Sequence, residues 1–290
     1  MRPQLSLAIA GKGPADGSVF WAAIAPMAMD QAIEIHFVYD HDAALVGMPA
    51  NVHAHCMSGA SLFAMWGEAL SRATGNYVAI LHLTAPPAYG WLDAIKAALA
   101  DKPLIICGPV EADYPKDDDR WIGYLVEYVQ FHRPIANTMN EIPGNNLVLR
   151  RKLAGSPEHL ANGGFSKTQL LGQWRANGIA PVWAMEAVVT HMRAFDRRNF
   201  RARRFHHART YAAKRAAGTS LARRAFLMFT TPVVAVLRVW RIARHAFRLP
   251  KMRRTFFRFL VPIFASESSW ALGELIGYTT LKVGNSGKLD

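Results

Sequence analysis

The stretch "YVAILHLTAPPAYGW", residues 77–91, decides the fold class. Residues 77–83 form a short, nearly continuous apolar run, which is typical of a strand buried on both faces. Two prolines then end the run, and a helical pattern starts near Trp91. Enzymes with parallel sheets place their chemistry where such strands end. This strand end offers only His82, Leu83 and Thr84, with no carboxylate.

The same alternation of apolar runs and helical patterns continues through the first 192 residues. Strands are predicted at residues 5–10, 33–40, 77–83 and 103–110, and helices at 18–29, 59–74 and 91–100. A helix at 119–134, a loop at 141–151, a helix at about 167–177 and a strand pair within 181–192 follow. Apolar strands separated by helices predict an α/β fold with a largely parallel sheet covered on both faces.

Composition limits the class of protein. The chain has 290 residues, 51% of them hydrophobic, so it is long enough for a substantial core and is not a disordered chain. Its two cysteines give no metal-binding spacing and no disulfide framework, which favours a reducing compartment. The apolar run near the N-terminus is short for a signal peptide, and a first strand explains it better.

Charge is distributed unevenly along the chain. Residues 193–258 contain 19 Lys and Arg against one acid, Asp196, whereas the rest of the chain contains 15 Lys and Arg against 20 acids. The sequence therefore predicts a mildly acidic body, residues 1–192, and a strongly basic region, residues 193–290.

Three interpretations of the basic region compete: a membrane-surface anchor, a nucleic-acid-binding surface and an ordinary solvated helix face. Its apolar segments, such as "FLMFTTPVVAVL" and "FRFLVPIFA", favour the membrane surface, because a nucleic-acid-binding arm does not need them. Residues 225–237 are apolar but contain Pro232 and are shorter than the ~20 residues that span a bilayer. We expect helices that lie on an anionic membrane, with no nucleic acid as partner.

Several motifs together carry a resemblance to a known family. They are "GASLFAMWGEALSRATGNYVAIL" at 59–81, the Pro-Pro-x-x-Gly-Trp pattern at 86–91, "IPGNNLVLRR" at 142–151, the strand end at His191 and "WALGELIGY" at 270–278. With them, the chain resembles inverting family-2 glycosyltransferases of the GT-A fold, a nucleotide-diphospho-sugar transferase-like, Rossmann-type mixed sheet. It is most similar to bacterial members with a membrane-associated C-terminal extension. The resemblance covers about residues 4–285.

The resemblance implies a nucleotide-binding region formed by Gly11, Asp40, His82 and Thr84. Without the resemblance, Asp40 would be interpreted as an acidic residue in a turn. The resemblance also implies a donor and acceptor pocket along the Pro143-Gly144-Asn145-Asn146 loop, which is otherwise a plain β-turn.

The element "HHARTYAAKR", residues 206–215, resembles a family segment that follows the catalytic domain. By this resemblance Arg209 and Arg215 bind the diphosphate, since Arg pairs with oxyanions in a bidentate manner. Solvated arginines are the alternative.

The chain departs from the family pattern at three positions. The resemblance implies a divalent metal, Mg²⁺ or Mn²⁺, held by acids where this chain has His82-Leu83-Thr84. The catalytic base position is occupied by Lys167, and a usual Arg-Asn pair is replaced by Trp66-Gly67. A protonated Lys cannot accept the proton of an acceptor hydroxyl unless burial lowers its pKa strongly.

Two accounts of the function remain open. In the first, the chain transfers a sugar from a nucleotide-sugar to a membrane-linked or envelope polysaccharide or glycolipid acceptor. Either His82 and His191 then hold a softer metal, or Lys167 neutralises the diphosphate without one. In the second, it is a non-catalytic homologue that binds or scaffolds beside an active glycosyltransferase or polysaccharide assembly proteins. Both accounts place it on the cytoplasmic face of the bacterial inner membrane.

Overall fold

The computed structural model describes residues 3–13, 15–135 and 141–282. Contacts divide the chain into two units. The sheet unit consists of Met1–Asp113 and Phe131–Arg193, and the helical unit of Tyr114–Gln130 and Ala194–Asp290. The segment Tyr114–Gln130 therefore packs with the C-terminal helices. The residues before it and those after it, as far as Arg193, belong to the sheet unit.

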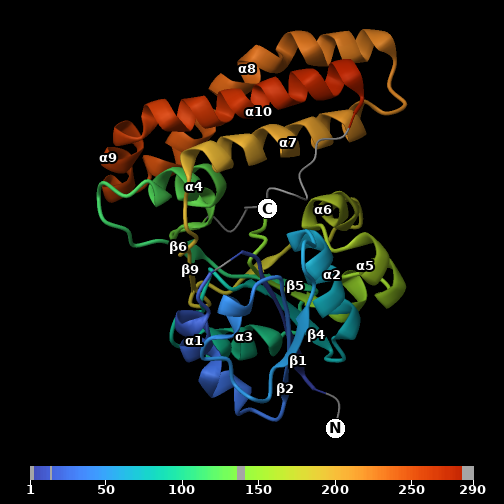
Figure 1. The fold of residues 1–290 in the computed structure, drawn as a ribbon, viewed down its shortest axis with the longest axis vertical. Coiled ribbons are helices and arrows are strands. Elements are labelled where there is room, and N and C mark those ends of the chain that lie inside the picture. The colour runs from blue at the N-terminus through green and yellow to red at the C-terminus, as the bar shows by residue number, and fades with distance from the viewer. Residues whose placement is uncertain (1–2, 14, 136–140, 283–290) are drawn as a thin grey trace. The chain divides into compact units, whose positions relative to one another are not determined.

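The sheet unit is built on a seven-stranded mixed sheet (Figure 1). Its strands are β1 (Leu5–Gly11), β2 (Ile33–Tyr39), β3 (His53–Cys56), β4 (Tyr77–His82), β5 (Ile105–Cys107), β7 (Asn146–Arg150) and β8 (Val182–Trp183). Their order is β3-β2-β1-β4-β7-β5-β8, with β7 antiparallel to both of its neighbours and the other pairs parallel. A second, two-stranded parallel sheet pairs β6 (Val110–Glu111) with β9 (Val189–Thr190).

Helices cover both faces of the large sheet (Figure 1). They are α1 (Ser18–Ala28) and α3 (Trp91–Leu99) on one face, and α2 (Leu62–Arg72), α5 (Pro157–Gly163) and α6 (Lys167–Ala176) on the other. Short 3₁₀ helices lie at η1 (Asp42–Leu45), η2 (Val129–Phe131) and η3 (Arg151–Leu153). Every residue of β1 and of β4 is buried, as expected of central strands between two helical layers. The predicted α/β class with a largely parallel sheet is confirmed.

The observed strands differ from the predicted ones where the apolar runs in the sequence are short. The segment 141–151 was expected to be a loop, but it contains β7, because Asn146–Leu149 is buried between β4 and β5. The run 103–110 splits into β5 and β6. Strand β3, "HAHC", has no apolar run because it lies at the sheet edge with mostly exposed side chains.

The helical unit contains five α-helices in the part that the structure describes. They are α4 (Arg120–Glu127), α7 (Arg197–Ala216), α8 (Leu221–Ala246), α9 (Pro250–Arg258) and α10 (Leu260–Thr280). Helices α7, α8 and α10 lie side by side (Figure 1).

The motif "WALGELIGY" packs α10 against α7. A Cβ atom on Gly273 would lie 2.2 Å from the Phe205 carbonyl oxygen, and one on Gly277 would lie 2.5 Å from the Arg209 carbonyl oxygen. Only glycine permits this approach of the two backbones.

Helix α8 continues through Pro232, which the sequence analysis took as an interruption. It is 26 residues long, and its most apolar 18-residue stretch has a mean hydropathy of 1.5 with 22% of that stretch buried. By length and composition it is long and apolar enough to cross a membrane. The premise that Pro232 ends the apolar segment was therefore wrong.

Candidate functional site

The sheet has a topological switch point between β1 and β4. The chain passes from β1 to β2 in one direction across the sheet, and β4 lies on the opposite side of β1. In open α/β sheets, ligands bind outside the carboxyl ends of the strands at this point. Gly11 ends β1 and His82 ends β4, and the Leu83 N–H donates to the Ala10 carbonyl oxygen at 2.9 Å. The antiparallel strand β7 begins beside the end of β4, with Asn146 opposite Leu81. We call this region, where β1, β2 and β4 end and β7 begins, the carboxyl edge.

Asp40 and Gly11 have structural contacts at the carboxyl edge. The Asp40 carboxylate follows β2, and its Oδ1 accepts a hydrogen bond from the Gly13 N–H at 2.7 Å, which fixes the loop after β1. A Cβ atom on Gly11 would lie 2.9 Å from the Phe37 ring. Gly11 is therefore required by the packing of Phe37.

His82 is buried and bonded to the next turn of the chain. Its Nδ1 accepts a hydrogen bond from the Thr84 N–H at 3.0 Å and lies 2.8 Å from Thr84 Oγ1, while its ring lies 6.2 Å from that of Trp66. A neutral imidazole with Nδ1 as acceptor carries its proton on Nε2. In this tautomer His82 presents an N–H donor, and a metal would need that nitrogen deprotonated.

His191 belongs to the same part of the sheet unit. Its N–H donates to the Glu111 carbonyl oxygen at 2.7 Å, and the next residue, Met192, donates to the Thr84 carbonyl oxygen at 2.8 Å. Within the described residues, no group of three or more His, Cys, Asp or Glu side chains is arranged to hold a metal ion. His82, Leu83 and Thr84 supply no carboxylate, so they do not fit the oxygen-rich coordination of Mg²⁺ or Mn²⁺. A softer metal held by His82 and His191 stays a prediction.

Asn145 and Asn146 have different surroundings although they are adjacent. The Asn146 amide is fully bonded: Nδ2 donates to the Pro109 and Ala187 carbonyl oxygens at 2.8 and 2.7 Å, and Oδ1 accepts from Trp91 Nε1 at 3.0 Å. Asn145 is 3% exposed, and its Oδ1 is buried without a hydrogen-bond partner. An unsatisfied buried oxygen is rare and calls for an explanation such as a ligand.

Lys167 begins α6 and lies against the Pro143-Gly144 loop. Its Nζ donates to the Ile142 carbonyl oxygen and is 5.6 Å from the centre of the Phe131 ring. A Cβ atom on Gly144 would lie 3.5 Å from the Lys167 side chain. Pro143 is buried in the same loop. The structure thus brings together a cation and the loop that contains the unpaired Asn145 oxygen.

Trp66 and Gly67, which the resemblance aligns with an Arg-Asn pair, are used for packing. Trp66 Nε1 donates to the Leu81 carbonyl oxygen at 2.8 Å, at the end of β4. A Cβ atom on Gly67 would lie 2.3 Å from the Leu160 carbonyl oxygen, so α2 and α5 approach closely here. The sequence analysis noted these residues only as departures. Their pairing with β4 and α5, like the approach of Phe131 to Lys167, had no sequence signal.

Arg209 and Arg215 both lie on α7 and bond within the helical unit. Arg209 Nε donates to the Lys282 carbonyl oxygen at 3.1 Å, and the Arg215 guanidinium donates to the Tyr278 hydroxyl at 3.3 Å. Their binding to a diphosphate stays a prediction.

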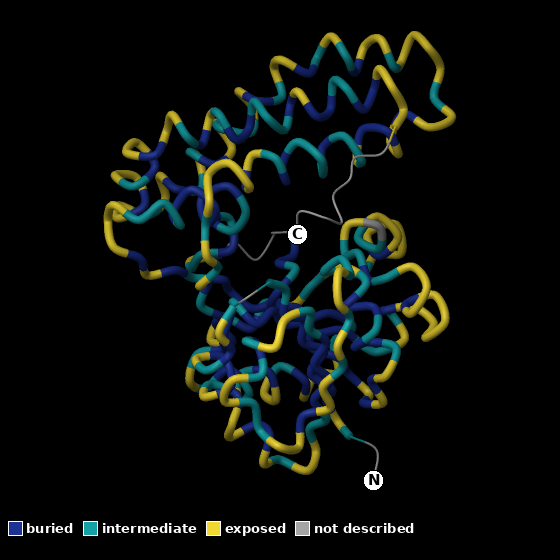
Figure 2. The backbone as a smooth tube through the Cα atoms, in the orientation of Figure 1, coloured by how far each residue is buried: buried dark blue, intermediate teal, exposed yellow. Residues whose placement is uncertain are grey.

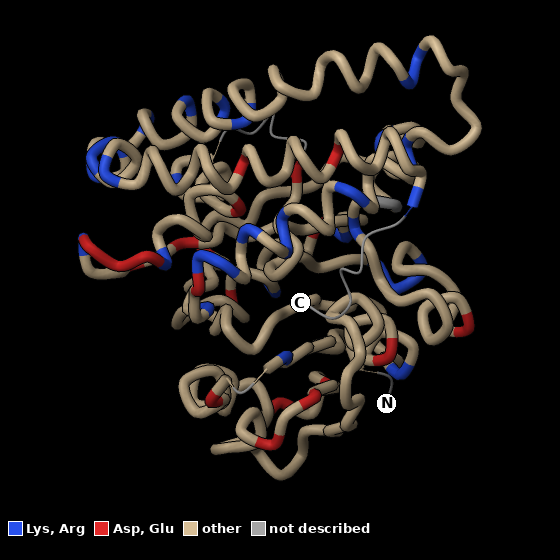
Figure 3. The backbone as a smooth tube through the Cα atoms, turned by 45° about the horizontal axis from the view of Figure 1, so that its top comes forward, with Lys and Arg blue, Asp and Glu red and all other residues tan. Residues whose placement is uncertain are grey.

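The helical unit also presents a large apolar surface on α8. Six side chains spaced three or four residues apart, or adjacent, are more than half exposed: Phe226, Phe229, Val233, Val236, Leu237 and Trp240. Figure 2 shows exposed turns along α8, and Figure 3 shows Lys and Arg near both of its ends with an uncharged middle. We call these six residues the α8 face. Contiguous exposed apolar surface of this kind marks a site of interaction with another apolar surface.

Comparison with known proteins gives little guidance. No protein-family profile matches the chain, and no curated protein matches it. Among solved structures, one titled "Crystal Structure of a Mycobacterial Protein" aligns with 67% of this chain and 68% of its own chain, at 11% sequence identity and a TM-score of 0.40. This likeness is too weak to support an argument about function.

Proposed function

We propose that the chain transfers a sugar from a nucleotide-sugar donor to a membrane-linked or envelope polysaccharide or glycolipid acceptor. The observation that carries the proposal is that Asp40, His82 and Asn145 all lie at the strand ends beside the topological switch point, in the same unit as Lys167, which bonds to the loop before β7. These residues come from four separate parts of the sequence, and they combine hydrogen-bonding groups with a cation. A nucleotide diphosphate needs both kinds of group.

The reaction sets the roles that these residues would take. An oxygen of the acceptor forms a bond to the anomeric carbon of the sugar, and the bond from that carbon to the diphosphate oxygen breaks. The bonding electrons leave with the diphosphate, and the acceptor hydroxyl releases its proton to water or to the departing diphosphate. The Lys167 ammonium is suited to stabilise the negative charge on the leaving diphosphate. The Asn145 oxygen is suited to accept a hydrogen bond from a hydroxyl group of the donor.

A specific observation favours a second candidate function. The base position is a lysine that already donates to the Ile142 carbonyl, and the Nδ1 of His82 already accepts a hydrogen bond from the Thr84 N–H. These features suit a subunit that binds the nucleotide-sugar or scaffolds an active glycosyltransferase without turnover.

The proposed location is the cytoplasmic face of a bacterial inner membrane, with a peripheral or monotopic attachment. The α8 face supplies apolar surface, and α8 itself contains several arginines. Each cationic residue near an anionic membrane contributes roughly 1 kcal/mol to binding. The exposed apolar side chains of the α8 face favour lipid over nucleic acid as the partner.

The test of ligand class is thermal stabilisation of the full chain by a panel of nucleotide-sugars and their nucleoside diphosphates. We expect at least one donor to raise the melting temperature, because a ligand that binds only the folded state stabilises it. If no member of the panel does so, the chain is not a nucleotide-sugar-binding protein of either kind.

Turnover separates the two candidates. The protein is incubated with the stabilising donor, labelled in its sugar, and with a lipid extract of bacterial membranes. Transfer of label into the lipid or polysaccharide fraction identifies a transferase. Binding of the donor without transfer or hydrolysis identifies the non-catalytic subunit.

A further inference from the structure

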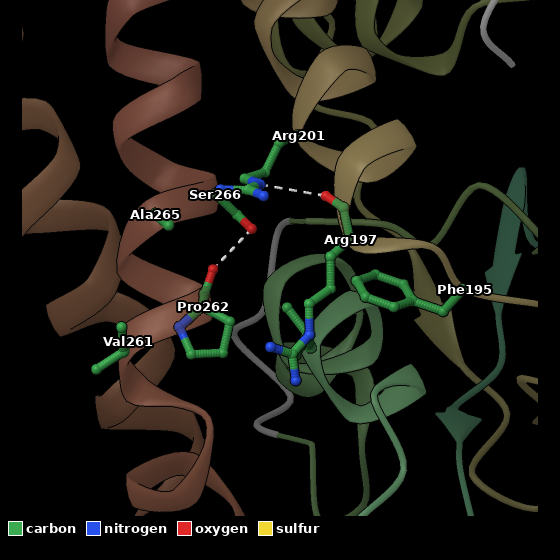
Figure 4. Close-up of a pocket in the computed structure, with 8 residues that line it drawn as sticks. Phe195, Arg197, Arg201, Val261, Pro262, Ala265 and Ser266 are labelled. Carbon is green, nitrogen blue, oxygen red and sulfur yellow. Dashed lines mark hydrogen bonds between the residues drawn. The ribbon is translucent and has the colours of Figure 1, made fainter.

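The helical unit contains a cavity that the proposed transfer reaction does not use. Its volume is about 180 Å³, several times the ~15 Å³ that one water needs. It lies among α4, the start of α7 and the start of α10 (Figure 4). Apolar side chains, including Ile122, Phe195 and Val261, form one part of its lining, and two arginines form another. We call it the Arg201 cavity.

The two arginines of the cavity differ in their partners. Arg197 is paired with the Asp119 carboxylate, with Nε 2.6 Å from Oδ2, and this hydrogen bond raises the pKa of Arg197. Arg201 donates from Nε to the Arg197 carbonyl oxygen at 3.3 Å. Within the described residues, no carboxylate pairs with Arg201. The cavity therefore has one guanidinium whose charge is balanced and one whose charge is available to an anion.

The apolar part of the lining continues onto the outer surface of α10. Val261 lines the cavity and is 79% exposed, and Phe264, less than one turn further along, is 47% exposed. On the opposite part of the lining, Arg201 projects from α7 (Figure 4). A ligand that matches this arrangement has an anionic group next to Arg201 and a hydrocarbon part next to Val261.

We propose that the Arg201 cavity binds the phosphate group of a membrane lipid, with the lipid chain along Val261 and Phe264. Arg binds phosphate oxygens through two parallel N–H donors, and burial of the chain removes apolar surface from water. The lipid is a phospholipid with a terminal phosphate or an isoprenoid phosphate, two sources of the same chemistry. The inference rests on the membrane location in the proposed function, but it does not require sugar transfer.

The test measures binding of short-chain, water-soluble lipids to the full chain by calorimetry. The probes are dihexanoyl phosphatidic acid, farnesyl phosphate and inorganic phosphate. Arg201→Gln should weaken binding of the lipid phosphates about tenfold or more, since a hydrogen bond to a charged group is lost. Arg198→Gln is the matched control: Arg198 is an exposed arginine of the same helix, outside the cavity lining.

Val261→Ser tests the hydrocarbon part without adding a charge. It should weaken binding of both lipids and leave the weak binding of inorganic phosphate unchanged. The lipid that binds more tightly to the wild-type protein identifies the source. Equal effects of Arg201→Gln and Arg198→Gln, inorganic phosphate binding as tight as that of the lipids, or no binding of either lipid would overturn the proposal.

Failure here is distinguishable from failure of the proposed function. If vesicles and nucleotide-sugars bind but neither soluble lipid does, only the Arg201 cavity proposal is lost. If no nucleotide-sugar binds but the lipids bind through Arg201, the cavity proposal stands without sugar transfer.

Discussion

Two adjacent asparagines of the carboxyl edge differ in their hydrogen bonding, which suggests different roles. The Asn146 side chain makes hydrogen bonds to the Pro109 and Ala187 carbonyl oxygens and to the Trp91 indole N–H. The buried Asn145 oxygen has no hydrogen-bond partner. The first pattern is that of a residue required for folding. The second is that of a residue kept for a ligand, because a buried oxygen without a partner costs stability.

Truncation of the two asparagines should therefore affect stability differently. Asn146→Ala leaves the Pro109 and Ala187 carbonyls and the Trp91 N–H unsatisfied, so we expect it to lower the free energy of unfolding by about 3 kcal/mol or more. Asn145→Ala should change it by less than about 1 kcal/mol. Urea denaturation of both variants checks this. Equal destabilisation would show that Asn145 is also a structural residue.

A histidine of β2 gives a prediction about pH. Burial lowers the pKa of His36 below its ordinary 6.5, although Glu34 lies 3.0 Å away and opposes this shift; His53 and Arg72 lower the pKa further. The unfolded chain then binds a proton that the folded chain does not, so stability is lost as pH falls below about 6.5.

Replacement of His36 should reduce this pH dependence. In His36→Gln, the fall in melting temperature between about pH 7.5 and 5.5 should be smaller than in the wild type. The exposed His159, replaced by Gln in the same way, is the control and should leave the fall unchanged. A fall in His36→Gln as large as in the wild type would show that other groups control it.

At the scale of elements, the contact between α7 and α10 organises the helical unit. Gly273 and Gly277 bring the two backbones together. The guanidinium groups of Arg204 and Arg238 both lie over the Trp270 ring of α10, 4.2 and 4.3 Å from its centre. Both arginines bond to Glu267, which is fully buried. Such a buried ionic network holds helices in one register and is costly to break.

A methyl group at this contact should be destabilising. Gly277→Ala places a Cβ atom 2.5 Å from the Arg209 carbonyl oxygen, so the helices must move apart at a cost of about 1–3 kcal/mol. Gly172→Ala in α6 is the control, because no atom lies within 4 Å of its Cβ position. It should be neutral or stabilising by about 0.5–1 kcal/mol. Thermal denaturation in mild detergent compares them, and a neutral Gly277→Ala would contradict the close contact.

At the scale of the whole molecule, the sequence predicted the parts that depend on hydrophobic periodicity. The long buried strands β1 and β4 and the helices α1, α2 and α3 were found within a few residues of their bounds. Strand β7 was missed because it follows a Pro-Gly turn and starts with an asparagine, Asn146, that is preceded by another. Pairing of Tyr114–Gln130 with the C-terminal helices depends on long-range contacts, which periodicity does not encode.

The sequence indicated His82, Lys167 and the Gly144-Asn145 loop as candidate site residues, and their role in binding stays a prediction. Their hydrogen-bonding state could not be predicted. The tautomer of His82 and the difference between Asn145 and Asn146 depend on hydrogen bonds to residues distant in sequence or to backbone groups. Those partners appear only in three dimensions.

The α8 face predicts how the whole chain binds membranes. Phe229 is 85% exposed, and Phe229→Asp should weaken binding to anionic vesicles about tenfold or more, since burial of a Phe side chain contributes roughly 1.5–3 kcal/mol. Met29→Asp in the sheet unit, 82% exposed, is the control and should have little effect. Raised salt should release the protein only in part, because apolar burial is not screened. Complete release by salt alone would contradict insertion of the α8 face.

The most direct test of the account is calorimetric titration of the full chain with the nucleotide-sugar that stabilises it most. The account predicts saturable binding that Asn145→Ala and Lys167→Ala each weaken by about 1–3 kcal/mol, the range for losing a hydrogen bond to a charged or buried group. Lys152→Ala, which removes an exposed lysine of η3, should bind as the wild type does. Wild-type binding by both Asn145→Ala and Lys167→Ala, or no binding by the wild type, would contradict a nucleotide-sugar site at the carboxyl edge.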